Sequence, residues 1–543
     1  MNPAWLMPLG SLFPLLLAAL AGHRLLRNHI LHLLPIAALP ALAAGILLPD
    51  GATLTLPTAL LEASWSMDMT GRLFQLFTAS GWFFAGLYSI FYFQTSPHKG
   101  RFAIPFLIAM SGNFLLPTTS DAVTFYSGFA VMSFASWGLV VYSGTEEARR
   151  AGRIYLALVV LGELMVFPGL VKGALWAETA DLAAIRSHWA LDPDPRLQIA
   201  LIFSGFAIKA GLFPLHFWLP LAHPVAPTPA SAVLSGCMIK AGLLAWIRLI
   251  PLGEFAMPIL GQTAAILAAC GLVLSLVAGL SQTNPKALLA YSSVSKMSLI
   301  VLLLAPAMLE PALTPLALTA TLLYAGFHSL HKTALFLGST LTPKLGAWSQ
   351  IPLVLLCASF AGLPWLSGAL LKVPIKTLHD QIAFPGAAAY LNLFKLAGFL
   401  TLLLMVRFLM LTRPAAKPGD PVPAKGLAVT WSLATLAALA LPAFLIPLKL
   451  LPDPGSVYTP IRPWLDPVFA LTLVTLLLFS LLQLRMPRPI PPGDIFHRLP
   501  RLPRGSLHRL QTRIQQMESH FSRPAGGLLY LSLILLFLLL LWQ

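Results

Sequence analysis

The stretch KAGLFPLHFWLPLAHPVAPTPASAVLSGCMIKAGLLAWIRL (residues 209–249) decides the fold of this chain of 543 residues. It joins two apolar segments, and each segment carries a lysine, Lys209 in the first and Lys240 in the second. Pro214 follows Lys209 by five residues, and a proline inside a helix removes a backbone hydrogen bond and kinks or opens the helix. Freed backbone groups at membrane depth are tolerated only where they are buried in protein or line a wet cavity. The stretch therefore predicts a broken transmembrane helix with a lysine beside the break.

The composition of the whole chain is that of a membrane protein. Apolar residues make up 57% of it and charged residues 10%, and its mean hydropathy is +0.80. A soluble domain carries roughly 25% charged residues, so the composition excludes a cytosolic enzyme and a secreted domain. The apolar residues form blocks long enough to cross a hydrocarbon layer about 30 Å thick. We predict an all-α polytopic membrane protein with about sixteen transmembrane helices.

A second interrupted segment, AGLPWLSGALLK (361–372), has Pro364 ahead of Lys372. Two broken helices five spans apart indicate an inverted repeat, because a unit with an odd number of helices reverses its topology when it is repeated. We therefore predict that helices seven and twelve are broken and that helices 4–8 and 9–13 form two inverted repeats. The predicted parts of the chain are the first three helices (1–100), the first repeat (101–250), the second repeat (259–412), helices fourteen and fifteen (426–484), a basic segment (485–525) and a last helix (526–543).

The charged residues of the loops predict the orientation. With the N-terminus placed outside, the inside loops hold twenty lysines and arginines, Lys286 among them, and the outside loops hold Arg186, Arg196 and Arg462. Basic residues accumulate in cytoplasmic loops, so we predict both termini on the outer side of a bacterial inner membrane. The first helix begins at the initiator Met without a small-residue cleavage site, which favours a retained helix. This distribution accounts for the net charge of +16 without a nucleic-acid partner.

The basic segment 485–525 begins with a proline-rich run and then places apolar residues at helical spacing between arginines. One interpretation is a solvated linker. The interpretation that we prefer is a helix along the cytoplasmic interface, with its basic face toward lipid phosphates or a neighbouring subunit.

Ionisable residues are concentrated in a few central spans. Inside a membrane they cost about 2.5–3.5 kcal/mol each and are functional candidates by default. A single lysine of this kind could also snorkel to the interface, but Lys209, Lys240 and Lys296 lie too deep for that. Lysines and histidines on successive helices, bridged by water, could form a lateral proton path. The predicted path residues are Lys209, Lys240, His328, Lys332 and Lys372, and the possible pairing or modulating residues are Glu163, Lys296 and His331.

The motif HSLHK places His328, His331 and Lys332 on one face of a helix. The two histidines could serve as haem ligands, as packing residues or as proton relays, and the first role lacks a facing pair of ligands. The three cysteines, Cys237, Cys270 and Cys357, form no CxxC pair, so the sequence indicates no iron–sulfur cluster, zinc finger or disulfide framework. We expect no cofactor or metal on this chain, and the chemistry that drives it must lie in partner subunits.

Four stretches resemble a known family: residues 209–249, NPKALLAYSSVSKMS (284–298), FHSLHKTALFLGS (327–339) and 361–372. They are similar to the proton-conducting antiporter-like subunits of respiratory complex I, of hydrogenase-4 and formate hydrogenlyase, and of Mrp-type sodium/proton antiporters. The resemblance covers roughly residues 60–410. It implies fourteen core helices with inverted repeats, followed here by segments similar to the distal complex I subunit.

The resemblance also implies roles for individual residues. Lys209 corresponds to the family's central lysine on broken helix seven, and Lys240 to the relay lysine on helix eight. His328 corresponds to the bridging histidine of helix eleven, and Lys372 to the residue at the exit half-channel. The family usually carries a glutamate on helix five that pairs with the lysine of helix seven, and Ala130 aligns there in this chain.

The missing glutamate leaves two readings. Either the pairing is lost, or Glu163 on the next helix takes its place; Glu163 could also be a packing carboxylate. Lys296 is a second departure, since the family often has a neutral residue there. It could extend the row of cations or face a carboxylate of a partner.

Our leading interpretation is a proton-translocating subunit of a multi-subunit energy-coupling complex. Its partners would be other membrane subunits and a soluble module on the cytoplasmic side, either a redox module or a zinc protein. One alternative is the family branch that pairs such a subunit with a carbonic-anhydrase-like zinc protein in bacterial inorganic-carbon uptake. The other is a structural subunit whose channel is vestigial.

Overall fold

The structure is a computed structural model of the chain. It describes residues 2–21, 29–56, 62–96, 99–363, 366–383, 387–414 and 422–445. All of these residues belong to one compact unit, Met1–Pro492. The predicted helices fifteen and sixteen, the basic segment 485–525 and Pro364 lie outside the described residues.

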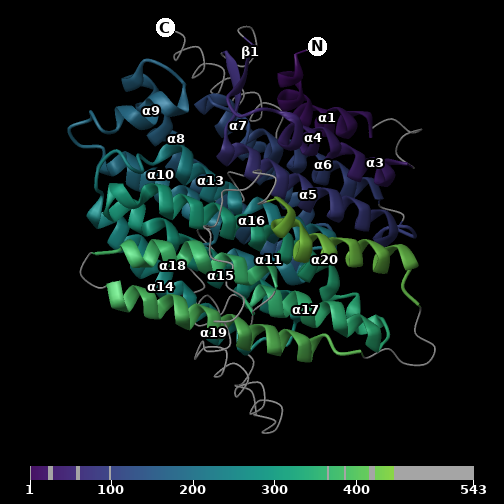
Figure 1. Cartoon of the computed structure of the whole chain (residues 1–543). Coiled ribbons are helices and arrows are strands. Elements are labelled where there is room, and N and C mark those ends of the chain that lie inside the picture. Colours follow the sequence, from purple (N-terminus) through teal and green to yellow (C-terminus); the bar gives the residue numbers. More distant parts are fainter. Residues whose placement is uncertain are drawn as a thin grey trace, which may run out of the picture. The chain divides into compact units, whose positions relative to one another are not determined.

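The described residues are mostly helical (Figure 1). The α-helices of the first half are α1 (Leu6–Leu20), α3 (Ile30–Ala37), α4 (Leu39–Leu47), α5 (Met69–Tyr92), α6 (Lys99–Leu115), α7 (Ala122–Val140), α8 (Glu146–Ala177), α9 (Leu182–His188), α10 (Arg196–Ala210), α11 (Trp218–Val225), α12 (Thr228–Val233) and α13 (Lys240–Leu249). Those of the second half are α14 (Pro258–Leu280), α15 (Pro285–Leu309), α16 (Thr314–Ser339), α17 (Gln350–Phe360), α18 (Lys372–Gln381), α19 (Ala387–Leu411) and α20 (Lys425–Leu445). Short 3-10 turns connect some of them: η1 (Pro3–Trp5), η2 (Leu215–Phe217), η4 (Pro311–Leu313), η5 (Thr342–Lys344), η6 (Ala347–Ser349) and η7 (Ser367–Leu371). The segment η3 (Leu234–Met238) is a π-helical turn between α12 and α13.

Eleven helical stretches among the described residues are long and apolar enough to cross a membrane. This number, with the helical content, confirms the prediction of a polytopic helical membrane protein. Helix α6 has 17 residues, and α17 and α20 are shorter apolar helices. The count of sixteen helices and the inverted repeats therefore stay predictions.

A two-stranded hairpin is the one sheet among the described residues, and the all-α prediction missed it. Strand β1 (Ala52–Leu56) pairs antiparallel with β2 (Ala63–Met67). Both strands alternate small polar and apolar residues, and their exposure alternates in the same way, as expected for a sheet with one covered face. Such short runs between long apolar blocks are easily taken for loops.

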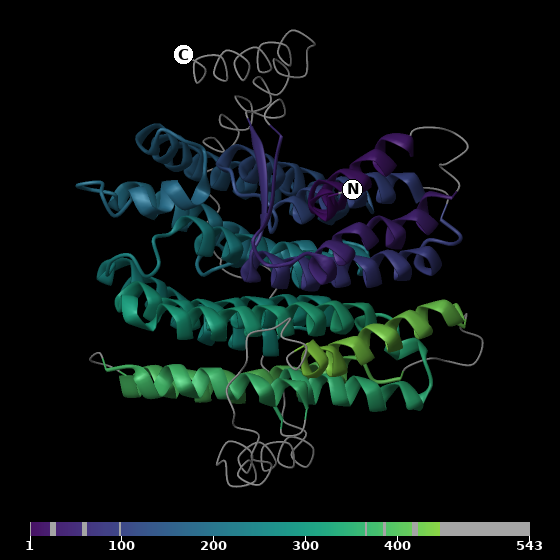
Figure 2. The same ribbon diagram turned by 45° about the horizontal axis from the view of Figure 1, so that its top comes forward.

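The central helices are those that carry the buried ionisable residues. The stretches Thr228–Leu249 and Pro285–Leu309 are buried along their whole apolar length, whereas α14 and α19 are buried over less than half of theirs. Figure 2 shows the teal central helices between the purple and blue N-terminal helices and the green C-terminal ones. A polar side chain on a central helix is thus shielded from lipid by other helices.

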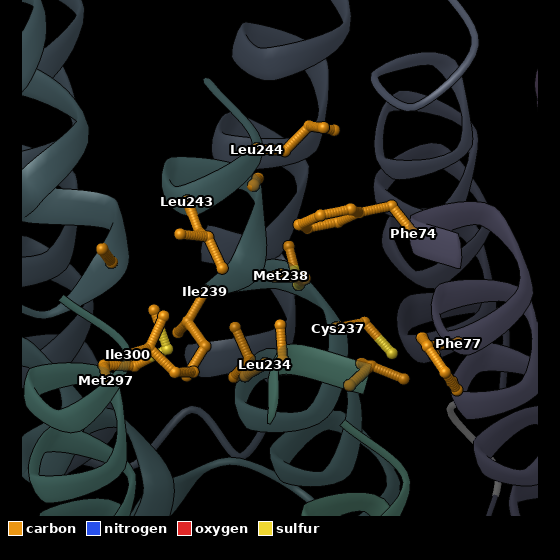
Figure 3. Close-up of a cluster of buried hydrophobic side chains, with 14 of the residues drawn as sticks. Phe74, Phe77, Leu234, Cys237, Met238, Ile239, Leu243, Leu244, Met297 and Ile300 are labelled. Carbon is orange, nitrogen blue, oxygen red and sulfur yellow. The ribbon is translucent and has the colours of Figure 1, made fainter. Parts of the chain in front are cut away.

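The packing around α13 is apolar and tight. Figure 3 shows Leu234, Met238, Ile239 and Leu243 pointing toward side chains of neighbouring helices, among them Phe74 and Ile300. Gly242 allows α13 to approach α10, because a Cβ atom at Gly242 would lie 2.6 Å from the Phe206 carbonyl oxygen. These contacts hold the helix of Lys240 close to the end of the helix that carries Lys209.

The structure interrupts a helix near each of the two predicted breaks, although Pro364 itself lies outside the described residues. Helix α10 ends at Ala210, and Gly211 follows with a φ of 70°, a left-handed conformation that glycine adopts without strain. Pro214 lies between this end and α11. The second interruption separates α17 from η7, and Gly362 within it has a φ of 78°.

Candidate functional site

Lys209 lies in the last turn of α10, where the partial negative charge of a helix C-terminus favours a cation. The end of this helix is well capped. The Trp218 indole N–H donates to the Ile208 carbonyl at 2.8 Å, and the Leu212 N–H donates to the Ala207 carbonyl at 3.0 Å. Lys209 therefore lies in the last turn of a helix whose end is held by hydrogen bonds, and it is only 3% exposed.

The Lys209 ammonium donates to the hydroxyl of Tyr155 on α8, at 3.2 Å. This hydroxyl lies 2.5 Å from the Ser136 hydroxyl and donates to the Ser133 carbonyl at 3.1 Å. A cavity of about 10 Å³, which is the space for one water molecule, is lined by Lys209, Tyr155 and Ser133. Lys209, Tyr155 and one serine of α7, Ser133, therefore line a water-sized space, and Ser136 contacts the Tyr155 hydroxyl beside it.

Glu163 lies on α8, two turns after Tyr155, and is 5% exposed. It is close enough to Lys209 for the two charges to interact, and it also interacts with Tyr126 of α7. We call Glu163, Lys209, Tyr155, Ser133 and Ser136 the glutamate cluster.

The structure changes the comparison with a helix-five glutamate. Ala130, the residue that aligns with this glutamate, is partly exposed, and it is not among the residues that line the cavity beside Lys209. The α7 residues that line it are Phe129 and Ser133. Ser133 is therefore the polar residue of α7 that lines this cavity.

Three other buried lysines come from three neighbouring helices. The Lys240 ammonium, on α13, donates to the Ser235 carbonyl in the π-helical turn. The Lys332 ammonium, on α16, donates to the Leu289 carbonyl at 2.8 Å and to the Ser292 hydroxyl at 2.6 Å, both on α15. The Lys296 ammonium, on α15, donates to the Tyr324 hydroxyl of α16 at 2.7 Å. Every one of these hydrogen bonds ends on a neutral oxygen.

The two histidines of α16 lie within the same region. His328 is within electrostatic range of Lys240, Lys296 and Lys332, and neither of its ring nitrogens has a hydrogen-bond partner among the described residues. His331 Nε2 lies 2.9 Å from the Ser359 hydroxyl of α17. We call Lys240, Lys296, Lys332, His328 and His331 the lysine cluster.

Ser359 continues the polar contacts beyond the lysine cluster. Its hydroxyl lies 2.9 Å from the Ser367 hydroxyl and accepts from the Gly368 N–H at 3.2 Å, so it connects α17 with η7 across the second helix break. Lys372 begins α18 after this break and, unlike the other predicted ionisable residues of the site, it is exposed.

The structure thus brings five of the predicted residues into one cluster and two, Glu163 and Lys209, into another. No hydrogen bond between described residues joins the glutamate cluster to the lysine cluster. Lys286, which the loop count treats as a loop residue, instead lies buried in the first turn of α15 and donates to the Ala226 carbonyl.

Sequence reasoning missed the hydroxyl partners. Tyr155, Tyr324 and Ser359 are aligned with no motif, yet each contacts a predicted site residue. A usable signal was present for one helix only: the run AYSSVSKMS (290–298) is rich in serine inside an apolar span. Among the described residues, no three His, Cys, Asp or Glu side chains form a group that could hold a metal ion.

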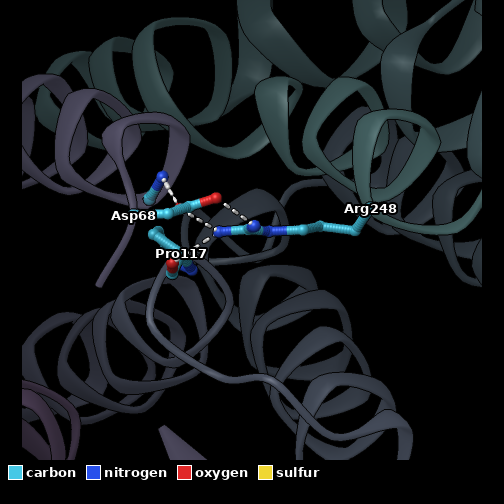
Figure 4. A network of polar contacts seen from close by, with 4 residues as sticks. Asp68, Pro117 and Arg248 are labelled. Carbon is cyan, nitrogen blue, oxygen red and sulfur yellow. Dashed lines mark hydrogen bonds and ion pairs between the residues drawn. The ribbon is translucent and has the colours of Figure 1, made fainter. Parts of the chain in front are cut away.

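An ion pair at the other end of α13 fixes this helix to α5 (Figure 4). The Arg248 guanidinium donates to both carboxylate oxygens of Asp68, at 2.6 and 2.7 Å. Asp68 also caps α5 by accepting from the Gly71 N–H at 2.7 Å. Burial raises the pKa of Asp68, but the hydrogen bonds and charge of Arg248 outweigh burial and hold this pKa below its usual 3.8.

The fold and the buried row of basic side chains define the class of antiporter-like polytopic membrane subunits. A family model described as NADH:quinone oxidoreductase/Mrp antiporter, TM, matches residues 119–375. NADH-quinone oxidoreductase subunit N of Deinococcus radiodurans is 30% identical over 366 residues, which cover 64% of this chain and 72% of that protein. The chain belongs to this family, as the resemblance of its motifs predicts.

Two further similarities concern the length of the chain relative to a longer protein and its fold. Hydrogenase-4 component B of Escherichia coli (strain K12) is 30% identical over 316 residues, which cover 52% of this chain and 46% of that protein. The chain therefore spans about half the length of this relative. A chain in the structure of the Mrp complex from Dietzia sp. DQ12-45-1b matches with a TM-score of 0.76 and 18% identity, over 99% of this chain and 62% of that chain, which shows a common fold.

Proposed function

We propose that this chain is the proton-translocating membrane subunit of a multi-subunit energy-coupling complex. The observation that carries the proposal is the lysine cluster. Five basic side chains from α13, α15 and α16 are at most 4% exposed, and His328 lies within electrostatic range of the other four. Burial of this kind costs free energy, so it points to a function rather than to stability.

Proton transfer fits the chemistry of these partners better than sodium binding does. Sodium, like other hard cations, prefers oxygen ligands and above all carboxylates. Glu163 is the one buried carboxylate in the described membrane-spanning helices. A buried lysine next to neutral oxygens, by contrast, changes its protonation readily, because a low dielectric disfavours the charged form.

The proposed path begins at Glu163 and Lys209, passes to Lys240 and Lys332, and continues through His331 and Ser359 toward Lys372. His328 and Lys296 lie beside the central part of this path. Because no hydrogen bond between described residues links Lys209 to Lys240, that step requires bridging water. Hydrogen bonds lie along part of the rest of the path: the Lys332 ammonium donates to the Ser292 hydroxyl, and the Ser359 hydroxyl lies between His331 and the Ser367 hydroxyl. The other steps require water as well.

The finer architecture belongs to the same proposal: sixteen helices, two inverted repeats and both termini on the outer side of the membrane. So do the partners, which would be other membrane subunits and a soluble module. The carbon-uptake alternative stays a prediction, and the proteins that co-purify with the full chain test it. A zinc protein would favour carbon uptake, and a redox module or antiporter subunits would favour the leading interpretation.

Replacing Lys209 with alanine tests proton transfer. The complex purified through this chain is reconstituted in liposomes, a potassium diffusion potential is imposed, and proton uptake is followed with a pH-sensitive dye. Positioned proton-transfer groups contribute about a hundredfold or more to rate, so we expect K209A to lower the uptake rate by about that factor.

The matched control removes a lysine of the same protein outside both clusters. Lys172 forms an ion pair with Asp192 and keeps a third of its side chain exposed, so K172A should retain the wild-type rate. Equal rates for K209A and the wild type would favour the vestigial channel and a purely structural subunit.

A further inference from the structure

A surface groove of about 570 Å³ lies along the first turns of α20. Its apolar wall includes Val429, Leu433 and Leu436, which repeat at helical spacing, and its other wall includes Leu345 and Trp348. Trp348 and Val429 are more than half exposed. An apolar groove on a membrane protein holds an acyl chain in one position because both of its walls contact the chain, whereas a flat apolar face contacts it on one side only.

One basic residue lines this groove, and two others lie close in the sequence to residues that line or contact its wall. Lys425 lines it, and Lys344 directly precedes the lining residue Leu345. Arg413 directly follows Thr412 in the sequence. The Thr412 carbonyl accepts a hydrogen bond from the Gln350 side chain, and Gln350 lies two residues after the lining residue Trp348. All three basic side chains are exposed, and no acidic residue is among those that line the groove. Tryptophan and basic residues together mark the level of lipid headgroups.

We propose that this groove binds an anionic phospholipid, with its phosphate at Lys344, Arg413 and Lys425 and an acyl chain along Val429, Leu433 and Leu436. Clusters of basic residues at the cytoplasmic ends of helices select anionic headgroups, and the apolar wall supplies the contact for the chain. The chain's own segment 485–525 is a poor occupant by charge, because it carries eight arginines and would meet three more cations.

The thermal stability of the purified full-chain complex, measured with and without added lipid, tests whether this site binds a phospholipid. After delipidation, the complex is titrated with phosphatidylglycerol and, separately, with phosphatidylcholine of the same acyl composition. Native mass spectrometry counts the molecules that stay bound. We expect one tightly held phosphatidylglycerol and no equivalent binding of phosphatidylcholine.

Two variants separate the headgroup from the acyl chain. The double variant K344E/K425E reverses exposed charges that make no hydrogen bond within the described residues, so it should fold normally. It should weaken phosphatidylglycerol binding by about tenfold or more, since each basic residue near an anionic surface contributes to affinity. A428W places a large ring in the groove and should displace the chain of either lipid.

The control reverses the exposed Arg101 and its neighbour Lys99, at the start of α6 on the same predicted side of the membrane, and should leave the count of bound lipid unchanged. Equal binding of both lipids, or unchanged binding in K344E/K425E, would overturn the proposal. So would a disulfide between V429C and a cysteine placed in segment 485–525, in a C270S background, because it would show that the chain itself fills the groove.

Discussion

The glutamate cluster and the lysine cluster solve the same problem, a buried ammonium group, in different ways. Lys209 has a carboxylate within electrostatic range, lies in the last turn of its helix and lines a water-sized cavity. Lys240, Lys296 and Lys332 have only neutral hydroxyl and carbonyl oxygens as hydrogen-bond partners. The first arrangement favours a charged lysine, and the second tolerates a charge without fixing it.

This difference suggests how the two clusters divide the work. Like charges in a low-dielectric interior repel strongly, so an additional proton in the lysine cluster raises the energy of its neighbours. The glutamate cluster can hold a charge because Glu163 compensates it. Movement of the Glu163 charge toward or away from Lys209 would then decide whether a proton is kept there or passed on.

Glu163→Gln breaks this comparison most directly, because it makes the two clusters alike. We expect proton uptake in the reconstituted complex to fall by about tenfold or more, which corresponds to an ordinary coupling energy between two sites. Loss of the carboxylate leaves Lys209 with neutral partners only, as in the lysine cluster.

A second substitution tests whether the position of the carboxylate or its presence matters. Ser133 lines the cavity beside Lys209 from α7, so E163Q/S133E should recover part of the uptake. A130E in the same background is the matched control and should not recover it, because Ala130 does not line the cavity. Wild-type uptake in E163Q alone would contradict a coupling role for Glu163.

The same two clusters show which features of the candidate site could be predicted from the sequence. Apolar blocks with single lysines predicted the membrane class and the deep residues, because few physical situations place a lysine inside an apolar span. The breaks near Lys209 and Lys372 could be predicted from Pro214 and the glycines, since these residues act locally on the backbone.

Other features depended on contacts between helices and could not be predicted. The partner of Lys209 is a tyrosine 54 residues away, and a tyrosine in an apolar span carries no signal of its own. Likewise, the sequence does not show that Ser133, rather than Ala130, lines the cavity beside Lys209; the alignment of Ala130 with the helix-five glutamate stays a prediction.

Removal of single tyrosine hydroxyls sharpens the comparison without changing a charge. The Tyr155 hydroxyl contacts Lys209, Ser136 and the Ser133 carbonyl, whereas the Tyr324 hydroxyl contacts Lys296 alone. A hydrogen bond contributes about 1 kcal/mol, so we expect Y155F to lower proton uptake by about fivefold and Y324F by less.

Tyr142→Phe is the control for these variants, since the Tyr142 hydroxyl pairs with Ser96 at 3.2 Å and touches neither cluster. Its uptake rate should equal that of the wild type. A larger effect for Y324F than for Y155F would reverse the order that the hydrogen bonds indicate, and would place the limiting step in the lysine cluster.

The smallest effect is expected at the ion pair that holds the far end of α13, and it should appear in stability rather than in transport. Asp68→Asn keeps a side chain that can cap α5 but removes the charge that faces Arg248. Asp68 is about half exposed, so solvent screens the pair, and we expect a loss of only about 1 kcal/mol in the free energy of unfolding. Thermal unfolding of the purified complex measures this loss.

The pH dependence of that loss identifies its cause. Because the pKa of Asp68 lies below its usual 3.8 in the folded protein, the ion pair stabilises the fold fully above that usual value, and the contribution disappears as the pH falls through the lowered pKa. The stability difference between wild type and D68N should therefore be constant from about pH 7 to about pH 5 and should shrink progressively as the pH falls through the lowered pKa. A difference that persisted at acid pH would assign the effect to the cap at Gly71, and a fall in proton uptake would show that the far end of α13 also positions Lys240.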